Sequence, residues 1–345
     1  MSSPCRVTGW DIGGVGAKCV HIDETGTPVG KRSAPLEVWK SPGEMEALLR
    51  ELAADNAAGG VAMAITMTAE LCDCFETKRD GVLHILESFH RAFPENPSWL
   101  LSNRGNWVAL DKAFDDPLQF AASNWVAAAS HLAKTVGDGL WVDVGSTTTD
   151  IIPLTGGAPA PLGGTDTERL VNGELVYTGV VRSNPNMLAR RVPVRGRWCR
   201  PADERFCSMG DCYVLLGDVD PALVDGFTSD GRSTEERFAM ARLARLVCSD
   251  REYLAERELR MLAAFLKGRQ LALIQDAMFQ VCSRLDVSPA VIPTGIGKFL
   301  AEETAERMGL NVRSADDCIP PGYDEQFPAF AAASELFAAM GGDGK

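Results

Sequence analysis

The stretch GWDIGGVGAKCVHIDETG, residues 9–26, describes a strand that carries Asp11, breaks at glycines and returns through Lys18 as a second apolar strand. A single glycine hairpin occurs in any sheet, so this stretch alone predicts only a turn. The design recurs in GLWVDVGSTTTDIIPLTGG, residues 139–157, where Asp143 ends an apolar strand before a glycine and small hydroxyl residues. Two such hairpins, each heading one half of the chain, predict an α/β protein with two duplicated lobes that face one another.

The chain length fits this division, because single cores stop growing near ~250–300 residues and this chain has 345, of which 46% are hydrophobic. The glycines of Gly137-Asp138-Gly139 follow an alanine-rich helix pattern and mark a boundary. We expect a first lobe over 1–137 and a second over 138–324, with a C-terminal helix in 325–345 that returns to the first lobe. Within the second lobe, 190–201 is expected to be irregular and 310–317 to be a strand.

Composition excludes several classes of partner. The net charge of −13 argues against nucleic acid or an anionic membrane, because both need a basic face. The N-terminus lacks a basic start before an apolar run, and no stretch reaches the ~18 apolar residues that a membrane span needs, so we expect a cytoplasmic protein. The ten cysteines contain no Cys-x-x-Cys pair and indicate reduced thiols more than zinc. An oligomer is compatible with the sequence.

The glycine turns suit phosphate, since consecutive backbone N–H groups bind phosphate oxygens. An aspartate beside each turn requires a cation between the two, and Mg²⁺ bridges carboxylates and polyphosphates. We therefore expect Asp11 and Asp143 to hold Mg²⁺, with Lys18 adding positive charge. A third turn precedes a helix at 295–298 and suits a flat ring or ribose. The expected amide and hydroxyl ligands are Gly13, Gly14, Gly145, Ser146, Thr147, Thr148, Gly295 and Gly297.

The order hairpin, hairpin, strand-GxG-helix resembles the superfamily of actin, sugar kinases and Hsp70. The motifs WDIGGVGAK, TMTAELCDCFETKRDGV, VDVGSTTTDIIPL and GGTDTERLVNGELVYTGVVR are similar to hydantoinase/oxoprolinase-like proteins linked to tetrahydromethanopterin C1 transfer, a group similar to methanofuran biosynthesis proteins. The resemblance implies two ribonuclease-H-like lobes with a ligand in the cleft between them. It also implies a condensation of an aminomethylfuran-methyl diphosphate with a tyramine- or tyrosine-derived phenol, which forms an aryl ether and releases pyrophosphate.

A phenol has an ordinary pKa near ~10 and attacks better when a carboxylate takes its proton. Glu70 and Asp73 follow an apolar strand, where sites are common, and Asp166 and Asp211 are further candidates. Asp166 and Asp211 have competing structural roles as first-turn helix acids, and Asp166 also as a partner of Arg169. Lys78 and Arg79 could bind an acidic acceptor or lie in a solvated turn.

Two other functions use the same motifs. An ATP-dependent hydrolase or a small-molecule kinase would bind ATP at the hairpins and adenosine at the third turn. A nucleotide-sensing or scaffold protein would bind a nucleotide without turnover. Phosphate hairpins do not separate these functions, because all of them bind polyphosphates. ATP is thus an expected ligand only under the alternatives, and the favoured partners are a small-molecule diphosphate and a phenol or amine acceptor.

Overall fold

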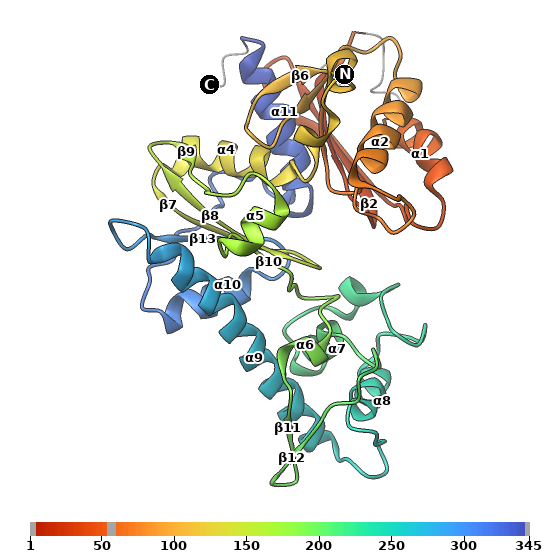
Figure 1. Ribbon diagram of the computed structural model, residues 1–345, viewed down its shortest axis with the longest axis vertical. Helices are drawn as coiled ribbons and strands as arrows, with labels where there is room; N and C mark the ends of the chain where they lie inside the picture. The colour runs from red at the N-terminus through yellow and green to blue at the C-terminus, as the bar shows by residue number, and fades with distance from the viewer. Residues whose placement is uncertain (1–4, 54–59, 342–345) are drawn as a thin grey trace. The chain divides into compact units, whose positions relative to one another are not determined.

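The computed structural model describes residues 5–53 and 60–341 and divides into two compact units (Figure 1). Unit 1 consists of Met1–Gly139, Pro153–Arg169 and Ala315–Lys345, and unit 2 of Leu140–Ile152 and Leu170–Ser314. The segment expected to carry the C-terminal helix thus belongs to unit 1. Residues 153–169, which the sequence assigns to the second lobe, also belong to unit 1 in this division.

Unit 1 contains a mixed sheet whose described strands run in the order β3-β2-β1-β4-β5-β6. The glycine hairpin makes β1 and β2 antiparallel, whereas β4 pairs with β1 in parallel. In this register Asp11 lies opposite Lys18 on β2 and beside Thr66 on β4. The strands are β1 (Cys5–Ile12), β2 (Gly16–Asp23), β3 (Pro28–Pro35), β4 (Ala62–Met67), β5 (Ser98–Leu101) and β6 (Trp107–Ala109).

Helices pack on this sheet, and Figure 1 shows α11 and α4 together on one side of it and α1 and α2 on the other. The backbone of α11 touches β1, since a Cβ on Gly9 would lie 2.0 Å from the carbonyl oxygen of Ala329. Glycine is therefore needed where the C-terminal helix closes the first sheet. The helices are α1 (Met45–Ala53), α2 (Lys78–Ala92), α3 (Leu110–Ala113), α4 (Asn124–Val136), α5 (Asp166–Val171) and α11 (Phe327–Ala339).

The sheet headed by the second hairpin has the described order β10-β8-β7-β13, with β9 paired to β8. As in unit 1, a parallel strand, β13, lies next to the first hairpin strand. The two turns close alike: the Gly13 N–H donates to the Gly16 carbonyl at 3.0 Å, and the Gly145 N–H to the Thr148 carbonyl at 2.9 Å. The strands are β7 (Gly139–Val144), β8 (Thr149–Thr155), β9 (Ala158–Pro159), β10 (Leu175–Val176) and β13 (Val291–Thr294).

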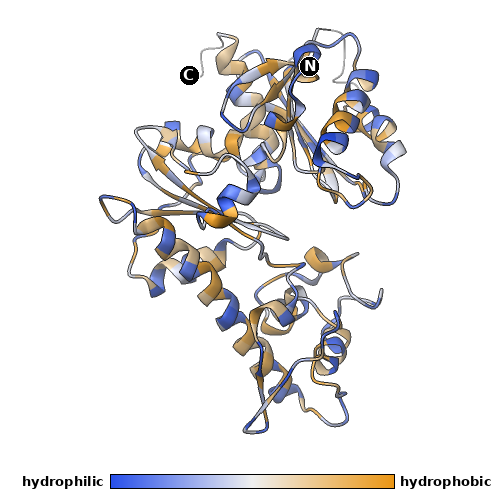
Figure 2. Ribbon diagram, in the orientation of Figure 1, coloured by the Kyte–Doolittle hydropathy of each residue, from blue (hydrophilic) through white to orange (hydrophobic). Residues whose placement is uncertain are grey.

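The rest of unit 2 is mainly helical, and the long helix α9 contacts α7, α8 and α10. The hydrophobic core of unit 2 includes Leu140, Val142 and Val144 of β7. Figure 2 colours the ribbon by hydropathy, with hydrophobic residues in orange. The helices are α6 (Pro185–Leu188), α7 (Met209–Leu216), α8 (Glu236–Arg245), α9 (Glu256–Cys282) and α10 (Lys298–Arg307).

Two local expectations are wrong. Residues 190–201 contain a hairpin, β11 (Val192–Val194) and β12 (Arg197–Cys199), instead of irregular chain. Its two turn residues, Arg195 and Gly196, both have positive φ, as a two-residue turn matched to strand twist requires. Residues 310–317 form only an isolated bridge, Val291 to Val312, because the chain leaves the sheet edge after one contact.

Short 3-10 turns connect these elements at Pro42–Glu44, Pro117–Phe120, Pro221–Val224 and Asp324–Gln326. Among the described residues, no helix is both long and apolar enough to span a membrane. The nine cysteines whose side chains are described are free thiols.

Candidate active site

Glu70 follows β4 in unit 1 and is 2% exposed. Backbone N–H groups of Glu70 itself and of Ala122 stabilise the charged form of its carboxyl. The carboxyl oxygen Oε2 is buried and has no hydrogen-bond partner among the described residues. Burial disfavours the charged form and raises the pKa of Glu70 to about 7; Asp166 adds to the rise, and the N–H groups and Lys78 oppose it. A carboxyl with such a pKa can accept a proton near neutral pH.

Ala122 directs its N–H at Glu70 from an unusual backbone conformation, with φ of 50°. Few non-glycine residues adopt the left-handed region, and those that do cluster at functional sites. On the other side, a Cβ on Gly81 of α2 would lie 2.1 Å from the Glu70 carbonyl oxygen. Glu70 is therefore fixed between the start of α2 and the loop before α4.

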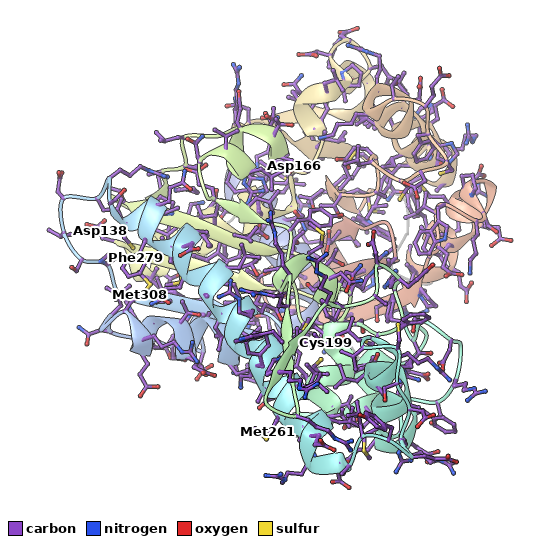
Figure 3. All side chains as sticks on the ribbon, turned by 60° about the horizontal axis from the view of Figure 1, so that its bottom comes forward. Asp138, Asp166, Cys199, Met261, Phe279 and Met308 are labelled. Atoms are coloured by element: carbon purple, nitrogen blue, oxygen red, sulfur yellow. The ribbon has the colours of Figure 1, made fainter. Side chains whose placement is uncertain are left out.

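A chain of charged groups lies beside Glu70. Lys78 Nζ lies 3.4 Å from Asp166 Oδ2, and Arg169 Nη1 lies 3.8 Å from Asp166 Oδ1. Arg169 is buried, with its guanidinium carbon 4.4 Å from the ring centroid of Trp125. Asp166, labelled on α5 in Figure 3, thus lies between two cations. One of them is Arg169, the partner that helical spacing suggested. Asp166 raises the pKa of Glu70 and Lys78 lowers it. Both groups are therefore close enough to act on its carboxyl and belong to the same site.

Asp11 ends its strand 8% exposed, and burial raises its pKa, with Lys18 and a hydrogen bond from Asn124 opposing the rise. The Asn124 oxygen Oδ1 accepts from the Trp125 N–H at 2.8 Å, which leaves its NH₂ group to donate to Asp11. Asp11 Oδ1 is buried with no hydrogen-bond partner in the described residues. Lys18 Nζ, expected to face phosphate, donates to the carbonyl of Glu325 at 2.9 Å.

The loop that enters α4 connects Asp11 with Glu70. Ala122 supplies its N–H to Glu70, and Asn124, two residues later, bonds to Asp11. Four buried polar atoms around this loop have no hydrogen-bond partner in the described part of the chain: Asp11 Oδ1, Glu70 Oε2, Ser123 Oγ and Trp125 Nε1. Native proteins leave few such atoms unpaired, so a cluster of them indicates a place where a ligand or water completes the bonding.

The corresponding aspartate of unit 2, Asp143, accepts a hydrogen bond at 2.5 Å from Thr294 Oγ1 on β13. Thr294 in turn accepts from Trp141 Nε1 at 2.7 Å. The glycines of the third turn pack against this hairpin: a Cβ on Gly295 would lie 2.5 Å from the Val144 carbonyl oxygen, and one on Gly297 2.3 Å from Val180 Cγ2. This contact accounts for both glycines, and their role toward a ring or ribose stays a prediction.

An oxygen-binding cation fits Asp11. Its buried, unpartnered Oδ1 and raised pKa describe a carboxylate that lacks a compensating positive charge. Among the described residues, no group of three or more His, Cys, Asp or Glu side chains could hold a metal by itself. An ion at Asp11 would therefore need water or phosphate oxygens as further ligands, as Mg²⁺ commonly has.

Asp211, which the sequence offers as a candidate for the base, instead caps helix α7 and pairs with Arg242. Its Oδ1 accepts from Nε and Nη2 of Arg242 at 2.9 and 2.6 Å, and its Oδ2 accepts from the Ser208 N–H at 3.0 Å. Both side chains of the pair are buried. All its oxygens are thus occupied within unit 2. Asp73, the other candidate, is exposed.

Sequence reasoning missed Ala122 and Asn124 as functional residues. Ala122 acts through a backbone N–H, for which no side-chain signal exists. Asn124 stands where the alanine-rich helix begins, a position that sequence alone assigns to capping.

Comparison with known proteins identifies the family. The sequence model of the hydantoinase/oxoprolinase family matches residues 62–333. A relative from Methanocaldococcus jannaschii, (4-{4-[2-(gamma-L-glutamylamino)ethyl]phenoxymethyl}furan-2-yl)methanamine synthase, is 31% identical over 331 residues, which cover 96% of this chain and 97% of the relative. A synthase of the same name from Methanococcus vannielii is 29% identical over 167 residues, covering 48% of this chain and 74% of that protein.

Among solved structures, nucleotide-free acetone carboxylase superposes with a TM-score of 0.59 at 12% identity, covering 96% of this chain and 70% of that one. This likeness concerns the fold. The expected fold class, an α/β protein with two ribonuclease-H-like lobes of the actin/sugar kinase/Hsp70 type, is confirmed. With its family model matched over most of its length, the chain belongs to the hydantoinase/oxoprolinase family.

Proposed function

We propose that this protein is a transferase of methanofuran-type cofactor biosynthesis. It condenses an aminomethylfuran-methyl diphosphate with a tyramine- or tyrosine-derived phenol and releases pyrophosphate. The observation that carries the proposal is the similarity to the furan-methanamine synthase along nearly the whole of both chains. The name of that relative contains a phenoxymethyl-furan, which is the ether that such a condensation makes.

The bonds of the reaction balance without a further reactant. The phenol oxygen forms a bond to the furanylmethyl carbon, the bond from that carbon to the diphosphate oxygen breaks, and pyrophosphate leaves with the electron pair. The phenol proton goes to Glu70 Oε2, the buried oxygen without a partner among the described residues. With the pKa of Glu70 at about 7, a large fraction of the carboxyl is ready to accept this proton at neutral pH.

The surroundings of Glu70 hold it for this role. The N–H groups of Glu70 and Ala122 stabilise the charged form of the carboxyl, and Oε2 has no hydrogen-bond partner among the described residues. Lys78 and Asp166 set opposing fields at the carboxyl, so the loss of either partner changes its affinity for a proton. The buried Arg169 guanidinium stacks on the Trp125 ring and, through its ion pair with Asp166, helps to fix the charged groups beside Glu70.

Asp11 and Asp143 are the proposed holders of Mg²⁺, which would neutralise charge on the diphosphate when bound. The N–H groups of Gly13 and Gly145 close their turns, and the remaining backbone N–H groups of each turn are the proposed donors to phosphate oxygens. We further place the enzyme in the cytoplasm and in the tetrahydromethanopterin-linked C1 pathway, following the resemblance of its motifs.

The test of this function is a product assay. Purified protein with Mg²⁺ should release pyrophosphate from the aminomethylfuran-methyl diphosphate only when a tyramine or tyrosine derivative is present, because ionisation is productive with the nucleophile in place and water excluded. ATP should yield neither phosphate nor ADP. Turnover of ATP that rises with an amide or hydroxyl acceptor, together with an inert furan diphosphate, would assign the chain to the hydrolase or kinase alternative.

Replacement of either aspartate by asparagine should weaken Mg²⁺-dependent binding of pyrophosphate about 10- to 100-fold, since each change removes a charged oxygen contact at constant volume. Calorimetric titration of Asp11→Asn and Asp143→Asn measures this directly. Asp138→Asn, which alters an aspartate outside both turns, is the matched control. Unchanged affinity in both turn variants would leave the hairpins as ordinary structural turns.

A further inference from the structure

The segment 178–183 of unit 2 folds directly against the second glycine turn. The Val180 N–H donates to the Gly145 carbonyl at 3.0 Å, and the N–H groups of Val181 and Arg182 both donate to the Ser146 carbonyl, at 3.0 and 2.9 Å. A Cβ on Gly179 would lie 2.5 Å from the Thr147 nitrogen. The backbone of this segment therefore has one position relative to the turn.

Buried side chains of α9 and α7 fix the segment 178–183 by hydrogen bonds. Gln270 of α9 donates through Nε2 to Thr178 Oγ1 and to the Gly179 carbonyl, both at 2.9 Å. Tyr213 of α7 donates to Gln270 Oε1 at 2.7 Å. Ser183 Oγ accepts the Gly179 N–H at 2.7 Å. Each polar group of this network has its partner, so the network orders the segment.

Arg182 is a cationic residue whose backbone this arrangement fixes at the turn, through its N–H bond to the Ser146 carbonyl. Its side chain is half-buried, and within residues 5–53 and 60–341 its guanidinium takes part in no ion pair or hydrogen bond. By contrast, Arg242 of the same unit is paired with Asp211 and Asp230, and Arg195 with Glu258. An arginine fixed by its backbone yet without an anionic partner is available to a ligand.

We infer that Arg182 binds the diphosphate at the second glycine turn. The inference rests on the proposed function, because it takes the phosphate-bearing substrate to lie at Ser146 and Thr147. A guanidinium pairs with phosphate through two parallel N–H···O bonds, so Arg182 adds direction as well as charge. It remains a cation throughout the reaction and stabilises the negative charge that collects on departing pyrophosphate.

Lys18 in the first hairpin donates to the backbone carbonyl of Glu325, so its ammonium group has a partner within unit 1. The hydroxyl residues of the second turn, Ser146 and Thr147, bring no positive charge of their own. Arg182 supplies it from a neighbouring segment. The site in unit 2 thus combines backbone N–H groups, hydroxyls and one guanidinium.

The experiment is calorimetric titration of inorganic pyrophosphate, with Mg²⁺, into the wild-type chain, Arg182→Gln and Arg190→Gln. Arg190 is an exposed arginine near the same segment and serves as the matched control. Arg182→Gln should bind pyrophosphate about 10- to 100-fold more weakly, as the loss of a charged hydrogen-bonding partner predicts. Arg190→Gln should bind it as the wild type does. Affinity of Arg182→Gln within twofold of wild type would overturn the inference.

A second measurement needs no variant. Phenylglyoxal modifies arginines, and peptide mass spectrometry of the wild-type chain reports how fast Arg182 and Arg190 react. Pyrophosphate should slow modification of Arg182 and leave Arg190 unaffected; equal rates for Arg182 with and without pyrophosphate would overturn the inference even if Arg182→Gln does not fold. A wild-type chain that binds no pyrophosphate would overturn the diphosphate function, whereas binding without any part for Arg182 would overturn this inference alone.

Discussion

Replacement of Glu70 by glutamine is expected to lower the rate of pyrophosphate release about 10²- to 10⁴-fold, the usual contribution of a general base. Glutamine keeps the size of the side chain and can still accept the N–H groups of Glu70 and Ala122, but it cannot take the phenol proton. Binding of the diphosphate should persist. Steady-state assays with Glu76→Gln, an exposed residue of the same loop, as control separate this effect from a general one.

The pH dependence should identify the same group. The base form of Glu70 is the active one, so wild-type activity should rise with pH and level off above the pKa of about 7. In Glu70→Gln the residual rate should lose this step. A wild-type profile without a step between pH 6 and 8, or a variant that keeps it, would assign the proton transfer to another residue.

Glu70 should also make the folded protein less stable as pH rises. Its pKa is 4.5 when unfolded and about 7 when folded, so between these values the native state holds a proton that the unfolded state has lost. The free energy of unfolding then falls with pH by up to ~1.4 kcal/mol per pH unit, about 3 kcal/mol across the window. Urea unfolding of Glu70→Gln should lack this slope, whereas Glu76→Gln should retain it.

The strand pattern alone predicted that Glu70 follows β4, because the apolar run of residues 62–67 ends shortly before it. The strand pattern could not show that the Glu70 carboxyl is buried. Ala122 and Gly81 form the surroundings of Glu70, and both reach it through backbone atoms. Likewise the sequence suggested a link between Asp166 and Arg169 by helical spacing. The link to Lys78, 88 residues away, depends on tertiary packing.

The two hairpins were predictable because local rules determine them: an apolar strand, glycines and a second apolar strand recur in both halves. The turn at Arg195 and Gly196 was not, because an arginine with positive φ carries no turn signature. Arg182 belongs to a motif that the sequence singled out, but its place beside Ser146 depends on three backbone hydrogen bonds and a glycine contact. Periodicity contains no such information.

Asp211 illustrates the opposite outcome, a buried carboxylate with no role toward a substrate. Replacement by alanine should lower the free energy of unfolding by ~3–5 kcal/mol, because it leaves the guanidinium of Arg242 buried without its main counter-charge. The Ser208 N–H at the start of α7 also loses its acceptor. Chemical denaturation at pH 7 measures the loss.

The matched control is Asp230→Ala, which removes the other carboxylate that contacts Arg242. Asp230 is 23% exposed, so water can replace part of its interaction and the loss should be clearly smaller. The folded fraction of Asp211→Ala should keep a turnover per molecule close to that of the wild type, unlike Glu70→Gln. A loss of stability below ~1 kcal/mol, or a well-folded Asp211→Ala without activity, would contradict the structural role and return Asp211 to the candidates for the base.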